Sequence, residues 1–180
     1  MKNTVDKIIH SDIPHFLPEV RESHLNLMRH IIGYLATSPI PTLNIDNLAK
    51  TWSVGKLTVY NLLAVMEDTS LIQIIRHEGL KKGKSKGGKI FFADPSLYAA
   101  FHGQLGNIRE AYFCMQMRKL GLTPECPKDD SQYDFKAGNK TFEIGGRSKK
   151  AKQADFVIRD DIDMPSGRVI PLWYLEFLKL

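Results

Sequence analysis

Residues 133–149, YDFKAGNKTFEIGGRSK, form the stretch that decides the fold of the second half of this chain. Gly138-Asn139 places glycine first in a two-residue loop, which favours a type II′ turn between two antiparallel strands. Such a turn fixes the register of the hairpin. The predicted pairs are Ala137 with Lys140, Lys136 with Thr141, Phe135 with Phe142 and Asp134 with Glu143.

The predicted hairpin has an apolar face and a charged face, because neighbouring side chains of a strand point to opposite sides. On the charged face Asp134 and Glu143 stand opposite each other, with Cβ atoms roughly 5 Å apart. Like charges in that position destabilise a hairpin. A divalent cation, Mg²⁺ or Mn²⁺, would offset the repulsion and would take Asp134 and Glu143 as its ligands. Alternatively, Lys136 or Arg147 neutralises the pair.

The composition is that of a globular protein with one sizeable core or two small ones: 180 residues, 43% hydrophobic and 25% charged. The formal net charge of +5 and the pI of about 9.1 favour a polyanionic partner such as nucleic acid. Cys114 and Cys126 lack the spacing of a zinc site, so we expect reduced thiols. The sequence MKNTVDKIIHSDIPH is too polar for a signal peptide, and we expect a cytoplasmic protein with no membrane partner.

The chain divides into three predicted parts. Residues 1–20 are typical of a linker, since Pro14 and Pro18 interrupt helix formation. Residues 21–102 are predicted to form a first domain and residues 103–180 a second one. The first domain is expected to begin with a helix over residues 21–37, whose apolar side chains fall on one stripe.

Two further helices are predicted over residues 45–52 and 56–68, joined by the short turn Ser53-Val54-Gly55. Asn44 is a suitable N-cap for the first of them. Their apolar side chains are spaced as in a helix-turn-helix motif. Strands predicted over residues 71–75 and 89–93 then flank a basic loop. This order of elements is typical of a winged helix-turn-helix domain.

If this domain contacts DNA, side chains at the start of its second helix face the groove, and lysines of the loop follow the phosphates. The groove-facing candidates are Lys56, Thr58, Tyr60 and Asn61. The phosphate-contacting candidates are Lys81, Lys82, Lys84, Lys86 and Lys89. The alternative is a packing or protein-docking module with a solvated loop. The loop approaches the spacing of a phosphate-binding P-loop, but predicted strands flank it, and we expect no nucleotide site.

The second domain is predicted to begin with a helix over residues 106–121, which carries Glu110 near its start. After the hairpin, Gly145-Gly146 lets the backbone turn sharply. The basic cluster that follows consists of Arg147, Lys149, Lys150 and Lys152. It suits either a phosphodiester substrate or a structural counter-charge. Strands are predicted over residues 156–158 and 170–178.

Together these segments resemble the C-terminal region of predicted prokaryotic AAA-type ATPases, where a winged helix and a restriction-endonuclease-like domain of unknown function follow an ATP-binding module. The matching segments are KIFFADPSLYAAF, GNIREAYF, YDFKAGNKTFEIGGRSKKAKQ, and DD followed by IPLW. The chain has no Walker A motif, so the resemblance implies a relative without the ATPase module. It also implies an AAA-type ATPase module or chain as partner.

The fold implied by the resemblance is α+β, with a winged helix-turn-helix domain followed by a small α/β domain of the PD-(D/E)XK nuclease type. In active members of that superfamily an aspartate and a glutamate on adjacent strands bind Mg²⁺, and a lysine two residues after the glutamate assists the reaction. Asp134 and Glu143 match the two acids. Glu110 matches an acid that several branches carry on a helix.

The sequence departs from that pattern at the lysine. Gly145 stands where the superfamily has the lysine. Lys149 or Arg147 would have to reach back to replace it. Gln153 matches a glutamine that some branches carry after the motif.

Three functions are compatible with these patterns. The favoured one is a nucleic-acid-binding accessory module of the AAA-type ATPase family, with a degenerate nuclease-like site. The second is a Mg²⁺-dependent DNA endonuclease that uses Glu110, Asp134, Glu143 and a displaced Lys149. The third is a protein-docking module. The missing lysine weighs against the second function, and the lysine-rich loop weighs against the third.

Overall fold

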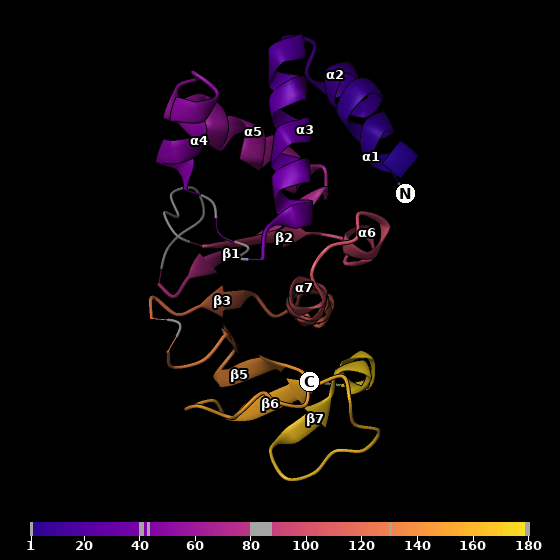
Figure 1. Cartoon of the computed structure of the whole chain (residues 1–180), viewed down its shortest axis with the longest axis vertical. Coiled ribbons are helices and arrows are strands. Elements are labelled where there is room, and N and C mark those ends of the chain that lie inside the picture. The colour runs from indigo at the N-terminus through magenta and orange to yellow at the C-terminus, as the bar shows by residue number, and fades with distance from the viewer. Residues whose placement is uncertain (1, 40–41, 43, 80–87, 130, 179–180) are drawn as a thin grey trace. The chain divides into compact units, whose positions relative to one another are not determined.

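The computed structural model describes residues 2–39, 42, 44–79, 88–129 and 131–178 (Figure 1). Its helices and strands make an α+β protein. The chain folds into two compact units. Unit 1 comprises residues 1–74 and 90–108, and unit 2 comprises residues 75–89 and 109–180. None of the described helices combines the length and the apolar composition that crossing a bilayer requires.

The first residues of unit 1 are helical, so the prediction of a linker over residues 1–20 is wrong. Helix α1 (Lys2–Lys7), the π-helical turn η1 (Ile8–Asp12) and α2 (Ile13–Phe16) follow one another directly. Val5, Ile9 and Ile13 are buried, and their spacing of four residues puts them on one helical stripe. Pro14 lies in the first turn of α2, directly after the π-helical turn η1.

Three longer helices of unit 1 agree closely with the predicted ranges: α3 (Glu22–Thr37), α4 (Ile45–Thr51) and α5 (Lys56–Asp68). Asn44 caps α4, since its side-chain oxygen accepts a hydrogen bond of 3.0 Å from the Asn47 N–H. The N-cap of α5 is Gly55, which offers no side-chain cap. Helix α3 lies between the N-terminal helices and the α4–α5 pair, which it contacts through α5 (Figure 1).

Two strands and two helices follow: β1 (Ile72–His77), β2 (Lys89–Phe92), α6 (Ser96–Ala100) and α7 (Leu105–Lys119). In unit 1, β2 pairs with β1, and the Ala93 N–H donates to the Leu71 carbonyl. The Gln73 amide adds a buried hydrogen bond of 3.1 Å to the Phe92 carbonyl. These bonds hold the two strands at the base of the predicted basic loop, most of which lies outside the described residues.

The sheet of unit 2 has the strand order β1-β3-β4-β5-β6-β7. Its remaining strands are β3 (Pro124–Cys126), β4 (Phe135–Ala137), β5 (Lys140–Gly145), β6 (Phe156–Arg159) and β7 (Val169–Pro171). The β3–β4 and β4–β5 pairs are antiparallel, and the others are parallel. Strand β3 is short and begins with a proline.

The predicted strand over residues 170–178 is correct only in its first residues. After β7 the chain turns into the 3₁₀ helix η2 (Leu172–Phe177). Leu175 is fully buried, whereas Trp173 is exposed. The Tyr112 hydroxyl of α7 donates a hydrogen bond of 2.7 Å to Glu176 Oε1, which fastens η2 to that helix. The apolar run that suggested a strand therefore buries one side of a helical turn.

The central hairpin has the predicted register over its ladder pairs, whereas the predicted pair of Asp134 with Glu143 lies outside the ladder. Phe135 pairs with Phe142, and the same alignment continues to the turn. Gly138 has a φ of 60°, the positive value that the first residue of a type II′ turn requires. The ring of Phe113 on α7 lies 5.5 Å from the Phe135 ring and 5.0 Å from the Phe142 ring. Helix α7 thus packs against the aromatic side chains of the hairpin.

The burial of the N-terminal helices generates a stability prediction. We expect Ile9→Ala to lower the free energy of unfolding by roughly 2–4 kcal/mol, because the fully buried side chain would leave a cavity. Phe16→Ala is the matched control, since that ring is 75% exposed. Urea denaturation followed by circular dichroism would measure both. Equal, small effects of the two substitutions would contradict the burial of this segment.

Candidate functional site

The two acids of the hairpin lie at the exit of the β4–β5 ladder, in unit 2. The last residue pair of the ladder is Phe135 with Phe142, and Asp134 lies one residue beyond it. The Asp134 N–H donates to the Phe142 carbonyl at 3.0 Å, and the Ile144 N–H donates to Asp134 Oδ2 at 2.8 Å. Asp134 is 6% exposed and Glu143 is 0% exposed. Both carboxylates are therefore withdrawn from water and require positive partners.

Lysine ammonium groups supply that charge. Lys149 Nζ lies 2.7 Å from Asp134 Oδ2 and 2.7 Å from Glu143 Oε2. Lys152 Nζ lies 3.1 Å from Glu143 Oε1 and 4.0 Å from Asp134 Oδ1. Each oxygen of Glu143 thus has an ammonium group beside it.

Neither residue predicted to neutralise the pair does so. Lys136 instead forms an ion pair with Glu78, with its Nζ 3.2 Å from Glu78 Oε2. Arg147 is exposed. Instead, the chain path after the two glycines brings Lys152 and Lys149, the displaced lysine that the sequence offered, to the acids.

Gly145 makes room for the Lys149 side chain. A Cβ atom at position 145 would lie 2.7 Å from Lys149 Cβ and 2.8 Å from its Cγ, which is closer than atoms pack. The Lys149 N–H donates to the Gly146 carbonyl at 2.9 Å, and this turn folds the chain back over Gly145. The stem of Lys149 therefore fills the space that a longer side chain at position 145 would take.

Charge and burial oppose each other at this site. Burial raises the pKa of Asp134, but the Ile144 N–H and the Lys149 ammonium outweigh it, so the pKa lies below its usual value. Burial likewise lowers the pKa of Lys149, but Asp134 and Glu143 outweigh it, and that pKa is raised. Asp134 and Lys149 are therefore held in their ionised forms at neutral pH.

Glu110 lies on α7 and forms an ion pair with Lys89, the first residue of β2. Lys89 Nζ is 3.0 Å from Glu110 Oε2 and 4.5 Å from the centre of the Phe135 ring. Burial raises the pKa of Glu110, with Lys89 opposing and Asp134 reinforcing the shift. The sequence placed Lys89 along DNA phosphates. In the structure Lys89 is buried, its stem covers the Phe135 ring and its ammonium pairs with Glu110.

The other residues predicted to contact nucleic acid differ in their exposure and in their ion pairs. Lys56 Nζ forms an ion pair of 2.9 Å with Asp46 on the preceding helix. Thr58 and Tyr60 are half-buried, and Asn61 is exposed. The predicted phosphate-contacting residues that lie outside the described part of the chain are Lys81, Lys82, Lys84 and Lys86.

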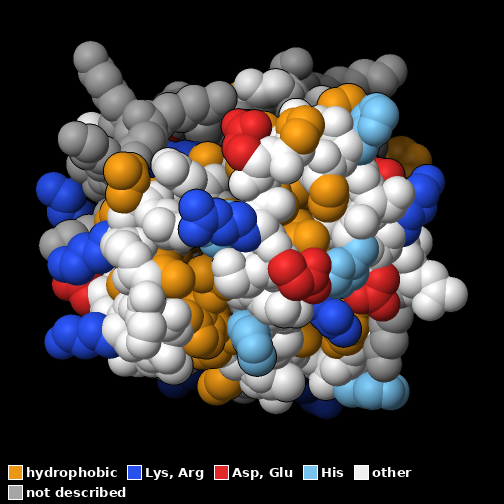
Figure 2. Space-filling view, turned by 90° about the horizontal axis from the view of Figure 1, so that it is seen from above, with side chains coloured by type: hydrophobic (Ala, Val, Ile, Leu, Met, Phe, Trp, Pro, Cys, Tyr) orange, Lys and Arg blue, Asp and Glu red, His pale blue; other side chains and the backbone are white. Residues whose placement is uncertain are grey.

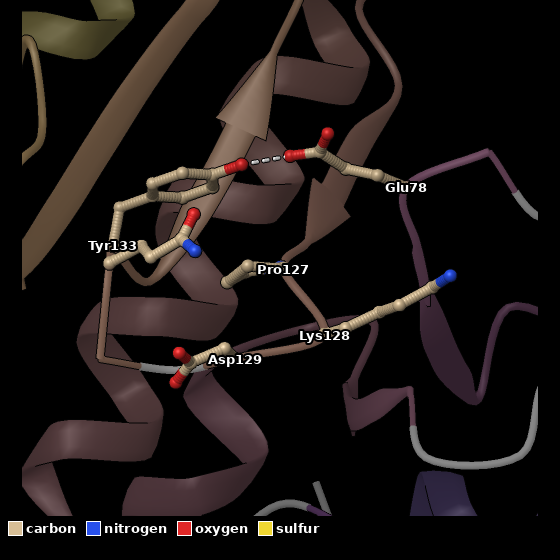
Figure 3. A pocket seen from close by; sticks show the side chains of 6 residues that line it. Glu78, Pro127, Lys128, Asp129 and Tyr133 are labelled. Atoms are coloured by element: carbon tan, nitrogen blue, oxygen red, sulfur yellow. Dashed lines mark hydrogen bonds between the residues drawn. The ribbon is translucent and has the colours of Figure 1, made fainter.

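A hollow of about 360 Å³ lies elsewhere in unit 2 (Figure 3). It is lined by Glu78, Pro127, Lys128, Asp129, Gln132 and Tyr133. The Tyr133 hydroxyl points across it and donates to Glu78 Oε1 (Figure 3). Burial and then Glu78 raise the pKa of Tyr133 to about 12. This bond fastens Tyr133, the residue before Asp134, to Glu78, the residue after β1.

Asp134 and Glu143 are suitable ligands for a hard divalent cation, because both offer carboxylate oxygens to the same ammonium group, Asp134 from just before β4 and Glu143 from β5. Among the described residues no third acidic, histidine or cysteine side chain joins them to form a metal-binding group. Glu110 is thus not brought in as a ligand. The donor pair fits a cation that keeps water or substrate oxygens as its other ligands.

Comparison with known proteins identifies a family. The chain belongs to the family described as a domain of unknown function (DUF8612), whose model matches residues 1–107. No curated protein and no solved structure matches the chain. The match ends before Glu110. Asp134, Glu143, Lys149 and Lys152 therefore lie outside the matched residues. None of these findings bears on the resemblance to AAA-type ATPases, which stays a prediction.

The lowered pKa of Asp134 predicts a pH-dependent contribution to stability. A carboxyl group with a lowered pKa stabilises the fold above its unfolded value of 3.8, and loses that contribution as the pH falls through the folded pKa. We expect Asp134→Asn to cost roughly 1–3 kcal/mol near neutral pH. The difference from wild type should shrink below about pH 4.

Chemical denaturation of both proteins across this pH range measures the effect. Asp163→Asn serves as the control, because Asp163 is exposed. A cost that stays the same at every pH would refute the ionic role of Asp134.

The contact between Gly145 and Lys149 predicts a specific coupling. We expect Gly145→Ala to destabilise the protein by roughly 1–3 kcal/mol, because the new methyl group overlaps the Lys149 stem. In a Lys149→Gly background the same substitution should cost little. A double-mutant cycle of unfolding free energies measures the coupling. Equal costs in both backgrounds would show that the two residues do not share this space.

Proposed function

We propose that unit 2 is a metal-dependent endonuclease of the PD-(D/E)XK type, in which Lys149 takes the role of the lysine missing at position 145. The observation that carries this proposal is the position of the Lys149 ammonium, 2.7 Å from both Asp134 and Glu143. The sequence pattern alone favoured a degenerate site, because glycine stands at position 145. A lysine that reaches both acids from elsewhere removes that objection.

In this proposal Asp134 and Glu143 would hold Mg²⁺ or Mn²⁺. A bound divalent cation lowers the pKa of coordinated water and polarises a phosphodiester. Lys149 would stabilise negative charge on the phosphodiester beside the two acids. Glu110 is a positioning residue here, because its ion pair holds Lys89 over the Phe135 ring, which lies next to Asp134 in the chain.

The second candidate function is nucleic-acid binding by a winged helix in unit 1. It is supported by the order α3-α4-α5-β1-β2 and by exposed Asn61 near the start of α5. Figure 2 views the side of the unit 1 helices, where basic side chains lie among hydrophobic, acidic and histidine ones. Binding to DNA that weakens steeply with added salt would favour this function over protein docking. An AAA-type ATPase as partner rests on the sequence resemblance.

The endonuclease proposal predicts cleavage that depends on Lys149. We expect the wild-type chain to nick supercoiled DNA in Mg²⁺ or Mn²⁺, and Lys149→Met to reduce the rate by roughly 10²-fold or more. Glu143→Ala should abolish cleavage, which also excludes a contaminating nuclease. The double variant Gly145→Lys with Lys149→Gly moves the lysine to the superfamily position, and it should recover part of the activity.

Lys150→Met is the matched control, because Lys150 is an exposed lysine of the same loop. It should cleave like the wild type. Wild-type cleavage that survives in Lys149→Met would show that this lysine is not catalytic. Wild-type protein that cleaves neither supercoiled, linear nor single-stranded DNA would leave only the binding function.

A further inference from the structure

Three acids and three lysines of unit 2 form one balanced cluster. The acids are Glu110, Asp134 and Glu143, and the lysines that pair with them are Lys89, Lys149 and Lys152. They come from β2, α7, the hairpin and the segment that follows β5. The formal charges of these six groups cancel. The protein has therefore placed its own ammonium groups where an external cation would otherwise be needed.

The lysines differ in how firmly they are held. Lys89 is buried and lies over the Phe135 ring, so its position is fixed by packing. The side chains of Lys149 and Lys152 are 25% and 38% exposed. They extend from residues 146–155, a segment without helix or strand. Their ammonium groups can thus reach solvent by side-chain rotation, whereas Lys89 cannot.

A divalent cation on Asp134 and Glu143 would compete with both ammonium groups for the carboxylate oxygens. Lys149 Nζ lies 2.7 Å from an oxygen of each acid, and Lys152 Nζ lies 3.1 Å from the other oxygen of Glu143. A cation that coordinates these oxygens replaces the lysines and repels them. Displaced ammonium groups then need an anion, and a phosphodiester beside the cation is suitable.

We infer that Lys149 and Lys152 exchange partners when the site is filled, from the two carboxylates to the phosphodiester, and that divalent cation and nucleic acid therefore bind with positive coupling. This inference rests on the proposed nuclease function. It gives Lys152, which no family motif includes, a role as a second phosphate-binding residue. Because coupling is reciprocal, each ligand raises the affinity for the other by the same factor.

Isothermal titration calorimetry tests the inference on the full chain. Ca²⁺ serves as the cation, because it binds carboxylates, and a short phosphorothioate DNA duplex serves as the phosphodiester. We expect the duplex to raise the Ca²⁺ affinity at least fivefold, and Ca²⁺ to raise the duplex affinity by the same factor. In Lys152→Met, Ca²⁺ alone should bind several-fold more tightly than in wild type, and the coupling should shrink.

Lys150→Met should keep the wild-type coupling. Lys149→Gln extends the test to the second lysine, and Lys152→Met alone suffices if that variant does not fold, because Lys152 is the more exposed of the two. Ca²⁺ that binds with equal affinity with and without the duplex would overturn the inference. Ca²⁺ binding lost in Glu143→Gln but uncoupled from the duplex would overturn it while leaving the nuclease proposal standing. No Ca²⁺ binding to any variant would overturn both.

Discussion

The structure of unit 2 depends on the burial of two carboxylates side by side. Asp134 and Glu143 repel each other, and water, which would screen them, is excluded. The hairpin register that brings them together is fixed by its turn and by the aromatic face that packs against α7. The repulsion cannot be relieved by sliding the strands, because a shift of one residue would move the phenylalanines out of the core. The charge that offsets this repulsion therefore comes from the segment that follows β5.

The segment of residues 146–155 turns back toward the two acids. Gly145 leaves open the space that the Lys149 stem enters, and the turn closed by the Gly146 carbonyl directs the chain back toward the acids. The Gln153 N–H then donates to the Gln132 carbonyl, which ties the end of the segment to the turn that precedes Asp134. Lys149 and Lys152 thus contact the acids from a segment that has no helix or strand. Side-chain charge and two backbone hydrogen bonds hold it in place.

The sequence predicted the elements that depend on local rules. The turn at Gly138, the cap at Asn44 and the helices of unit 1 follow from residues close in the chain. The ion pairs of Lys89 and Lys149 could not be predicted in the same way. Each depends on a backbone path across many residues, and a lysine in a basic run is normally solvated. The helical segment around Ile9 was not predicted, because Pro14 and Pro18 favoured a linker. The spacing of four residues between its buried apolar side chains is nevertheless typical of a helix.

The path of Lys149 has a consequence for recognising such sites in other chains. Its ammonium reaches the acids from four residues beyond Gly145, so a pattern written as a fixed spacing after the glutamate discards this protein. What the proposed nuclease chemistry would require is a distance between charged atoms, and many loop lengths can satisfy it. A glycine at the expected lysine position, followed within one turn by a lysine, is therefore a pattern worth searching for. Chains dismissed as inactive on motif spacing alone can be re-examined by that criterion.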